Sequence, residues 1–189
     1  MPFVKTAIPD LYIFEPRVFE DSRGYFFEAY NEETFREVTD FPFVQDNQSF
    51  SKRGAIRGLH YQLPPYAQTK IVRVISGTIL DVAVDIRKGS PTFGQHVTVE
   101  LSDENRKQLF IPRGFAHGFS VLSETAEVLY KCDNLYNKES DAGIIYNDPA
   151  LGIDWKIAPP EAIVSEKDKV LPVLRLCTNT FEYRIRNKE

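Results

Sequence analysis

The sequence has few cysteines, few histidines and no long apolar run. Its 189 residues include two cysteines and three histidines. Cys132 and Cys177 have neither the spacing of metal ligands nor the density of a secreted disulfide scaffold, which indicates a reducing compartment. No run of about 18 apolar residues could span a bilayer, and the first residues lack the pattern of a signal peptide. We therefore expect a cytoplasmic protein without a membrane partner.

An excess of positive charge is also absent. The chain has 23 Lys and Arg against 27 Asp and Glu, a formal net charge of −4. No overall field attracts a long polyanion, so nucleic acid is not an expected partner. A small anion such as a diphosphate needs only a few local cations, which this chain can supply.

The sequence does have alternating apolar and polar residues. The alternation is clearest over residues 78–87, where every second residue from Leu80 to Ile86 is aliphatic and the other face is mixed. No repeat, low-complexity tract or linker divides the chain, so residues 1–189 are expected to form a single domain. Further strands are predicted over residues 70–75, 94–101, 108–111, 118–122 and 126–132.

Many short strands at close spacing favour a mainly β fold, a jelly-roll barrel of antiparallel strands with a few short peripheral helices. Ser76 and Gly77 are typical of a tight connection between antiparallel neighbours. A helix is predicted from the N-cap Asn31 through Val38, with acidic residues in its first turn. The turn-rich C-terminal third is expected to hold loops and short helical turns, with at most a last strand or helix.

The three histidines differ in their surroundings. His96 lies on the polar parity of a predicted strand and is expected to be a solvated surface residue. His60 stands just before a predicted strand, and His117 follows a Pro-x-Gly segment. A lone histidine in a sheet protein more often has a structural, hydrogen-bonded role than a chemical one, so His60 and His117 need further context.

That context resembles the cupin superfamily. Pro112, Gly114 and His117 resemble its second half-motif, and Gly54 precedes His60 by six positions, as a glycine does in the first half-motif. Cupins are small jelly-roll barrels, which agrees with the strand pattern reached independently.

Two positions depart from the metal-binding cupins. Gln62 replaces the second histidine of the first half-motif, and Lys70 replaces a metal-binding glutamate. A lysine ammonium repels a divalent cation, so no metal site is expected. Lys70 shares strand parity with Val72 and Val74, which indicates that it points inward. Two roles fit this lysine: a side chain that extends from a strand end to water, or a charge that stabilises an oxyanion.

A narrower resemblance covers roughly residues 3–172 and leaves the tail, 173–189, outside. In its ordered blocks the sequence resembles the dTDP-4-dehydrorhamnose 3,5-epimerase family. The blocks are residues 21–28, 45–49, 54–62, 70–74, 111–119, 130–136 and 165–168.

The resemblance implies a reaction without a metal or redox cofactor. The family inverts C3 and C5 of dTDP-4-dehydro-6-deoxy-D-glucose to give dTDP-4-dehydro-L-rhamnose, on the route to dTDP-L-rhamnose. Both carbons flank the C4 ketone, so each proton leaves to form an enolate and is returned from the opposite face. Such a reaction needs a base, an acid across the ring and a positive group at the enolate oxygen.

By similarity, the catalytic residues are His60 as base, Asp168 as its partner, Tyr130 as acid and Lys70 at the oxyanion. Tyr130 lies on the inward-facing positions of its predicted strand, which fits a catalytic acid and an ordinary core tyrosine equally.

The resemblance assigns a further set to the dTDP-sugar. Tyr136 resembles a ring that stacks on thymine, although a turn tyrosine also fits its position. Asp141 stands where a glutamate is expected. The family is homodimeric through its N-terminal strands, here about residues 1–50, and completes its sites across the dimer. The substrate-binding set is Arg23, Glu28, Gln45, Asn47, Arg57, Lys70, His117, Tyr136, Asp141 and Lys167.

Three alternatives stay open at this point. A relative could epimerise C3 only or C5 only while keeping His60 and Tyr130. A non-catalytic cupin could bind a sugar nucleotide, although binding alone does not require a base and an acid on opposite faces. A metal-dependent oxygenase is disfavoured by Gln62 and Lys70.

Overall fold

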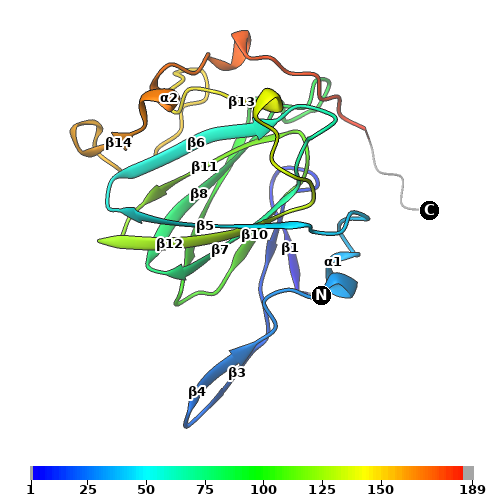
Figure 1. The fold of residues 1–189 in the computed structure, drawn as a ribbon, viewed down its shortest axis with the longest axis vertical. Coiled ribbons are helices and arrows are strands. Elements are labelled where there is room, and N and C mark those ends of the chain that lie inside the picture. Colours follow the sequence, from blue (N-terminus) through cyan, green and yellow to red (C-terminus); the bar gives the residue numbers. More distant parts are fainter. Residues whose placement is uncertain (1, 185–189) are drawn as a thin grey trace.

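The computed structural model describes residues 2–184, which fold into two facing antiparallel sheets and a protruding hairpin (Figure 1). The first sheet contains, in spatial order, β1 (Phe3–Lys5), β2 (Tyr12–Phe14), β10 (Gln108–Ile111), β7 (Lys70–Ser76), β12 (Thr125–Cys132) and β5 (Gln45–Lys52). The second contains β13 (Asp141–Gly143), β6 (Ala55–Gln62), β11 (Phe115–Val121), β8 (Thr78–Asp85) and β9 (His96–Ser102), and β14 (Ile163–Val164) pairs with β6. The hairpin is β3 (Val18–Asp21) and β4 (Gly24–Phe27).

The chain crosses repeatedly between the two sheets. From β5 to β12 only β8 and β9 are consecutive strands that pair with each other; every other step changes sheet. This is the winding of a jelly roll, so the predicted mainly β fold is confirmed, with the sheets forming a sandwich rather than a closed barrel. In the part of the chain that is described, no helix is long and apolar enough to cross a membrane.

The expectation that Ser76 and Gly77 join paired neighbours is wrong. β7 lies between β10 and β12, whereas β8 lies in the other sheet between β11 and β9. Gly77 therefore forms a corner between sheets. Its φ of +86° favours glycine, and a Cβ there would overlap the carbonyl oxygen of Thr125. Alternation identifies a strand but does not say which strand pairs with it.

Other expectations differ from the structure at element boundaries. His60 lies inside β6 and not before a strand. The N-cap Asn31 is confirmed, since its Oδ1 accepts from the Glu33 amide at 2.9 Å, but α1 (Glu32–Phe35) ends before Val38. The C-terminal third forms loops and short 3-10 turns, as expected, but it holds two short strands, β13 and β14, and the helix α2 (Glu166–Lys169) where a single last strand or helix is predicted. Residues 185–189 of the predicted tail lie outside the described residues.

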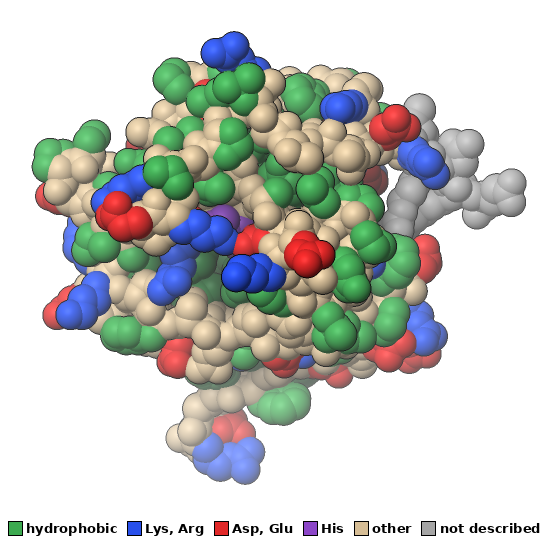
Figure 2. Space-filling model, turned by 45° about the horizontal axis from the view of Figure 1, so that its top comes forward, with side chains coloured by type: hydrophobic (Ala, Val, Ile, Leu, Met, Phe, Trp, Pro, Cys, Tyr) green, Lys and Arg blue, Asp and Glu red, His purple; other side chains and the backbone are tan. Residues whose placement is uncertain are grey.

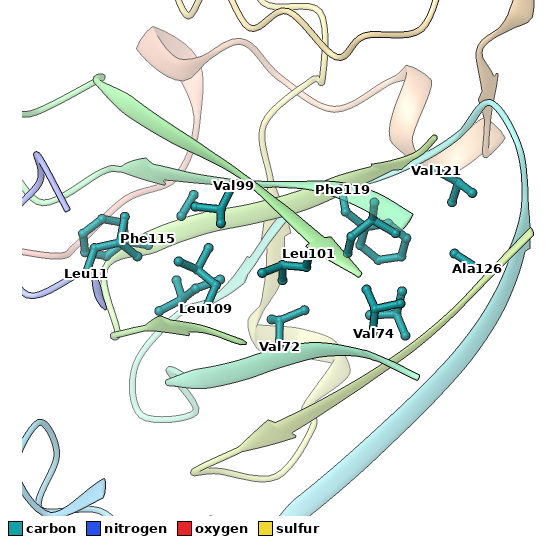
Figure 3. Packing of buried hydrophobic residues seen from close by; sticks show 14 of the residues in the cluster. Leu11, Val72, Val74, Val99, Leu101, Leu109, Phe115, Phe119, Val121 and Ala126 are labelled. Carbon is teal, nitrogen blue, oxygen red and sulfur yellow. The ribbon is translucent and has the colours of Figure 1, made fainter. Parts of the chain in front are cut away.

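The main core lies between the inner faces of the two sheets (Figure 3). Val72 and Val74 of β7 meet residues such as Leu101 of β9 and Phe119 of β11 there. Each such buried side chain contributes roughly 1.5–3 kcal/mol. Phe119 and the partly buried Tyr130 also line a cavity, so they mark where the core ends and a polar space begins.

Substituting Gly77 tests the corner between the sheets. Gly77→Ala should lower the free energy of unfolding by about 3 kcal/mol, because the left-handed backbone costs about 1–2 kcal/mol and the methyl group also meets the Thr125 backbone. Gly89→Ala is the matched control, since Gly89 has a φ of +78° with nothing within 4 Å of an added Cβ. Urea unfolding should show a loss of about 1 kcal/mol for the control. Equal losses in the two variants would contradict the close approach at Gly77.

Candidate active site

Two adjoining cavities open between the sheets and share His60, Tyr130 and Lys167. The larger has a volume of about 510 Å³ and the smaller about 370 Å³. The space-filling view shows a histidine at the bottom of a hollow with lysine and arginine side chains around it (Figure 2). A hollow of this size with convergent polar groups is the natural place for a small-molecule ligand.

A β-bulge in β6 aims two of the lining side chains. Arg57 and His60 are three positions apart, so regular alternation would place them on opposite faces of the sheet. The register of β6 against β11 shifts between His117 and Phe119, and both Arg57 and His60 line the larger cavity. A Cβ at Gly58 would lie 2.6 Å from the Gly118 Cα, so the two strands need glycine here.

The bulge and α2 together create a histidine–carboxylate pair. His60 Nε2 lies 2.7 Å from Asp168 Oδ1, although 108 positions separate the residues. The Gly58 amide donates to Asp168 Oδ2 at 3.3 Å, and Ser165 caps α2 by accepting from the Asp168 amide. Burial raises the pKa of Asp168, but the bonds from His60, Gly58 and Ser165 outweigh it and hold the pKa below its usual value. The carboxylate is therefore ionised and oriented.

Lys70 reaches the same space from the first sheet. It begins β7 on the parity of Val72 and Val74, and its Nζ lies 5.8 Å from the centroid of the Tyr130 ring. Burial lowers the pKa of Lys70, and the nearby Cys132, Asp81 and Asp141 oppose that shift. The ammonium is thus poorly hydrated, which makes it a strong electrostatic partner for an anion.

Tyr130 stands on β12, the next strand of the first sheet. Its Cα partners are Asn47 of β5 and Val72 of β7, and it lines both cavities. Burial raises the pKa of its phenol, so the hydroxyl keeps its proton at neutral pH. His60 and Tyr130 therefore face the cavity from opposite sheets.

A second histidine–carboxylate pair lies beside the first, and the sequence does not predict its carboxylate as a site residue. His117 is the Cα partner of His60, and its Nε2 lies 2.7 Å from Asp81 Oδ1. Asp81 is fully buried, and its Oδ2 has no hydrogen-bond partner among the described residues. An aspartate between Ile79 and Ala83 on one face of a strand is the signal that could have identified it.

The smaller cavity holds most of the predicted nucleotide-binding residues. Gln45 and Asn47 reach it from β5, and Tyr136 and Asp141 from the segment after β12. Lys167 forms an ion pair with Asp141, and this bond is the main reason that the pKa of Lys167 is raised. The Tyr136 hydroxyl lies 3.3 Å from the same carboxylate.

Three predicted positions differ from this picture. Arg23 and Glu28 are exposed on and beside the β3–β4 hairpin, and neither lines the two cavities of the single chain. Arg23 instead pairs with Asp21. His96 is half-buried, so its prediction as a solvated residue is wrong. At the start of β9 the alternation of exposed and buried residues is incomplete, because His96 and Val97 are both partly buried.

A jelly roll whose lumen presents a histidine–carboxylate pair, a lysine and a tyrosine defines a cupin-type protein with an acid–base site. The sequence model described as dTDP-4-dehydrorhamnose 3,5-epimerase matches residues 5–175. The chain belongs to the dTDP-4-dehydrorhamnose 3,5-epimerase family.

Known relatives agree in sequence and in structure. The enzyme of this name from Salmonella typhimurium is 55% identical over 177 residues, 92% of this chain and 96% of the relative. The crystal structure of the one from Elizabethkingia anophelis has a TM-score of 0.88 at 54% identity, covering 92% of this chain and 96% of that one. A Legionella pneumophila epimerase in complex with dTDP-4-keto-L-rhamnose has a TM-score of 0.92 at 45% identity, covering 97% and 98%.

Replacing Lys70 tests the cost of its burial. The lowered pKa means that the folded chain binds this proton less tightly than the unfolded chain, so the lysine destabilises the fold below that pKa. Lys70→Met should raise the free energy of unfolding by about 1 kcal/mol at pH 7. The gain should disappear as the pH rises through the lowered pKa toward about 10.4, the value of an unfolded lysine.

Lys131→Met is the matched control for this measurement. Lys131 lies on β12 and pairs with Asp46 at 2.9 Å, so its removal should bring no gain. Urea unfolding across a range from neutral pH to beyond the pKa of an unfolded lysine provides the test. A Lys70→Met variant that is no more stable than the parent at neutral pH, or whose gain does not change with pH, would contradict the account of Lys70.

Proposed function

We propose that the protein inverts C3 and C5 of dTDP-4-dehydro-6-deoxy-D-glucose, giving dTDP-4-dehydro-L-rhamnose for dTDP-L-rhamnose biosynthesis. The observation that carries this proposal is the arrangement of four residues around the two adjoining cavities: His60 and Tyr130 line both, Asp168 lines the larger and Lys70 lines the smaller. Family membership and the ligand of the Legionella enzyme support the substrate.

His60 acts as the base in this proposal. Asp168 is an ionised carboxylate that can only accept, so the hydrogen of the neutral imidazole lies on Nε2. Nδ1 is then the nitrogen that takes a proton from C3 or C5. The imidazolium that forms is stabilised by the Asp168 carboxylate, which is the role of the acid in other histidine–carboxylate pairs.

Lys70 stabilises the enolate. Removing a proton beside the C4 ketone places negative charge on its oxygen, and a poorly hydrated ammonium in the same space lowers the energy of that charge. The positive charge is on the protein before the reaction starts, so no group has to reorganise when the enolate forms.

Tyr130 returns the proton on the other side of the ring. It approaches from the first sheet while His60 approaches from the second, so a sugar between them is contacted on both faces. A phenol with a raised pKa holds its proton until a carbanion is present to receive it. Abstraction on one face and return on the other inverts the carbon.

A proton-exchange measurement separates this function from its rivals. The substrate is incubated with enzyme in heavy water, and NMR shows which carbons acquire deuterium. Label at both C3 and C5 is expected. Label at one carbon identifies a single-position epimerase, and no label identifies a binding protein.

His60→Asn should reduce the exchange rate by at least about 10²-fold, because the base is lost. The affinity for dTDP, measured by calorimetry, should change by less than about threefold, because the imidazole acts on the sugar and not on the nucleotide. His96→Asn on β9 is the matched control and should exchange at the parent rate. Exchange that persists in the His60 variant would remove His60 from this role.

We also propose that the active enzyme is a homodimer in which the β3–β4 hairpin reaches the second copy. The hairpin projects away from the sandwich (Figure 1) and exposes Phe19, Tyr25 and Phe26. An exposed aromatic arm of this kind needs a partner surface. A second copy would place Arg23 and Glu28 at the cavity that the single chain leaves without them.

Subunit mixing tests the exchange of hairpins. Arg23→Ala and His60→Asn chains, each of low activity alone, are unfolded together and refolded as a mixture. If Arg23 serves the partner's cavity, each mixed dimer contains one intact site, and roughly a quarter of the parental rate should return. Mixtures of either variant with itself are the controls. If dimers shown to contain one chain of each variant recover no activity, the proposal that the β3–β4 hairpin serves the partner's cavity is wrong.

A cytoplasmic location stays part of the proposal. Both cysteines are free thiols in the structure, which agrees with a reducing compartment.

A further inference from the structure

Gln62 ends β6 at the position where metal-binding cupins have their second histidine, and its side chain is buried. Its Nε2 donates to the Tyr66 carbonyl at 2.6 Å and to the Leu135 carbonyl at 3.1 Å, and its Oε1 accepts from the Asn137 amide at 2.7 Å. Both donors and the acceptor are thus used by backbone groups. The amide joins the loop after β6 to the segment after β12.

Two of the three bonds of Gln62 lie on either side of one residue, Tyr136. Leu135 and Asn137 are the neighbours of Tyr136 on either side, and the Tyr136 amide itself donates to Gln45 Oε1 at 2.9 Å. The backbone of Tyr136 is therefore held by two glutamine side chains, one from each sheet. Tyr136 as a whole residue remains 57% exposed, and it lines the smaller cavity.

An exposed loop that is ordered before its ligand arrives binds more tightly, because the ordering cost is met during folding and not during binding. Other bonds join the same two loops: Asn134 Nδ2 donates to the Pro65 carbonyl at 3.0 Å, and Gln68 Nε2 donates to the Asn134 carbonyl at 2.8 Å. Gln62 differs from these two because it contacts both neighbours of Tyr136 and is itself buried.

We propose that Gln62 is a positioning residue for nucleobase recognition: it holds the Tyr136 ring in place to stack on the thymine of the substrate. The inference rests on the proposed function, which supplies the nucleotide. It gives the position that corresponds to a ligand in metal-binding cupins a task at the nucleotide end of the cavity. Gln62 acts through Tyr136 and not on the sugar.

Gln62→Met tests this role, because methionine keeps the length and volume of the side chain and removes all three hydrogen bonds. The affinity for dTDP should fall about tenfold, a part of what loss of the stacked ring would cost. The affinity for inorganic pyrophosphate should not change, because that probe has no base. KM for the dTDP-sugar should rise while kcat stays near the parental value.

A double-mutant cycle shows whether the effect passes through the ring. In a Tyr136→Leu background, Gln62→Met should have no further effect on dTDP affinity, since the ring it positions is gone. Gln48→Met is the control for the substitution itself: Gln48 is exposed on β5, bonds Glu127 and should leave both affinities unchanged.

Equal weakening of dTDP and pyrophosphate, no loss of dTDP affinity, or full additivity with Tyr136→Leu would each overturn the proposal. If the Gln62→Met variant does not fold, the exchange rate of the Asn137 backbone amide is measured in the parent protein instead. Slow exchange before dTDP is added supports the positioning role. Slow exchange only after dTDP is added overturns it. Failure of the proposed function is seen separately, as a parent enzyme that exchanges no protons in heavy water.

Discussion

The space between the two sheets contains buried carboxylates, and supplying each of them with a hydrogen-bond partner is the constraint on which the rest of the structure depends. A carboxylate taken out of water costs several kcal/mol unless partners replace the lost hydration. The Asp168 carboxylate obtains its partners from His60 and from the Gly58 amide of the bulged strand. Asp81 obtains one from His117, which is the neighbour of His60 across the strand pair. The bulge, α2 and the β6–β11 pairing are all required by these contacts.

Much of the fold can be predicted from the sequence, because strands that face an apolar core are recognisable by their alternation. β8 is the clearest case. The sequence does not predict β5 as a strand, since its inward residues are polar and show no apolar period; Gln45, Asn47 and Ser49 line the cavities. The prediction at Gly77 is wrong for a different reason: pairing depends on distant strands, and local sequence does not contain that information.

The site residues that lie in the short sequence blocks shared with the epimerase family can be predicted from the sequence. The blocks include His60, Lys70, Tyr130 and Asp168, and the fold brings these residues around the two adjoining cavities. Asp81 is not predicted as a site residue: its place between Ile79 and Ala83 indicates a buried carboxylate, but the local sequence does not identify His117 as its partner. Arg23 and Glu28 belong to a block, but a single chain does not carry them to the cavity, since their hairpin points away from the sandwich.

The two positions that depart from the metal-binding cupins show how one jelly roll can support different chemistry. In metal-binding cupins, the positive charge belongs to a metal ion that stays in place only while its ligands bind it. Lys70 provides a charge that is covalently part of the strand, and Asp81 and Asp141 oppose the loss of its proton. Because Lys70 supplies the positive charge from β7, the side chain at position 62 does not have to bind a metal ion. Its amide is then free to bond the backbone of the Tyr136 segment. The glutamine at this position thus joins the loop after β6 to the segment that carries Tyr136 at the smaller cavity.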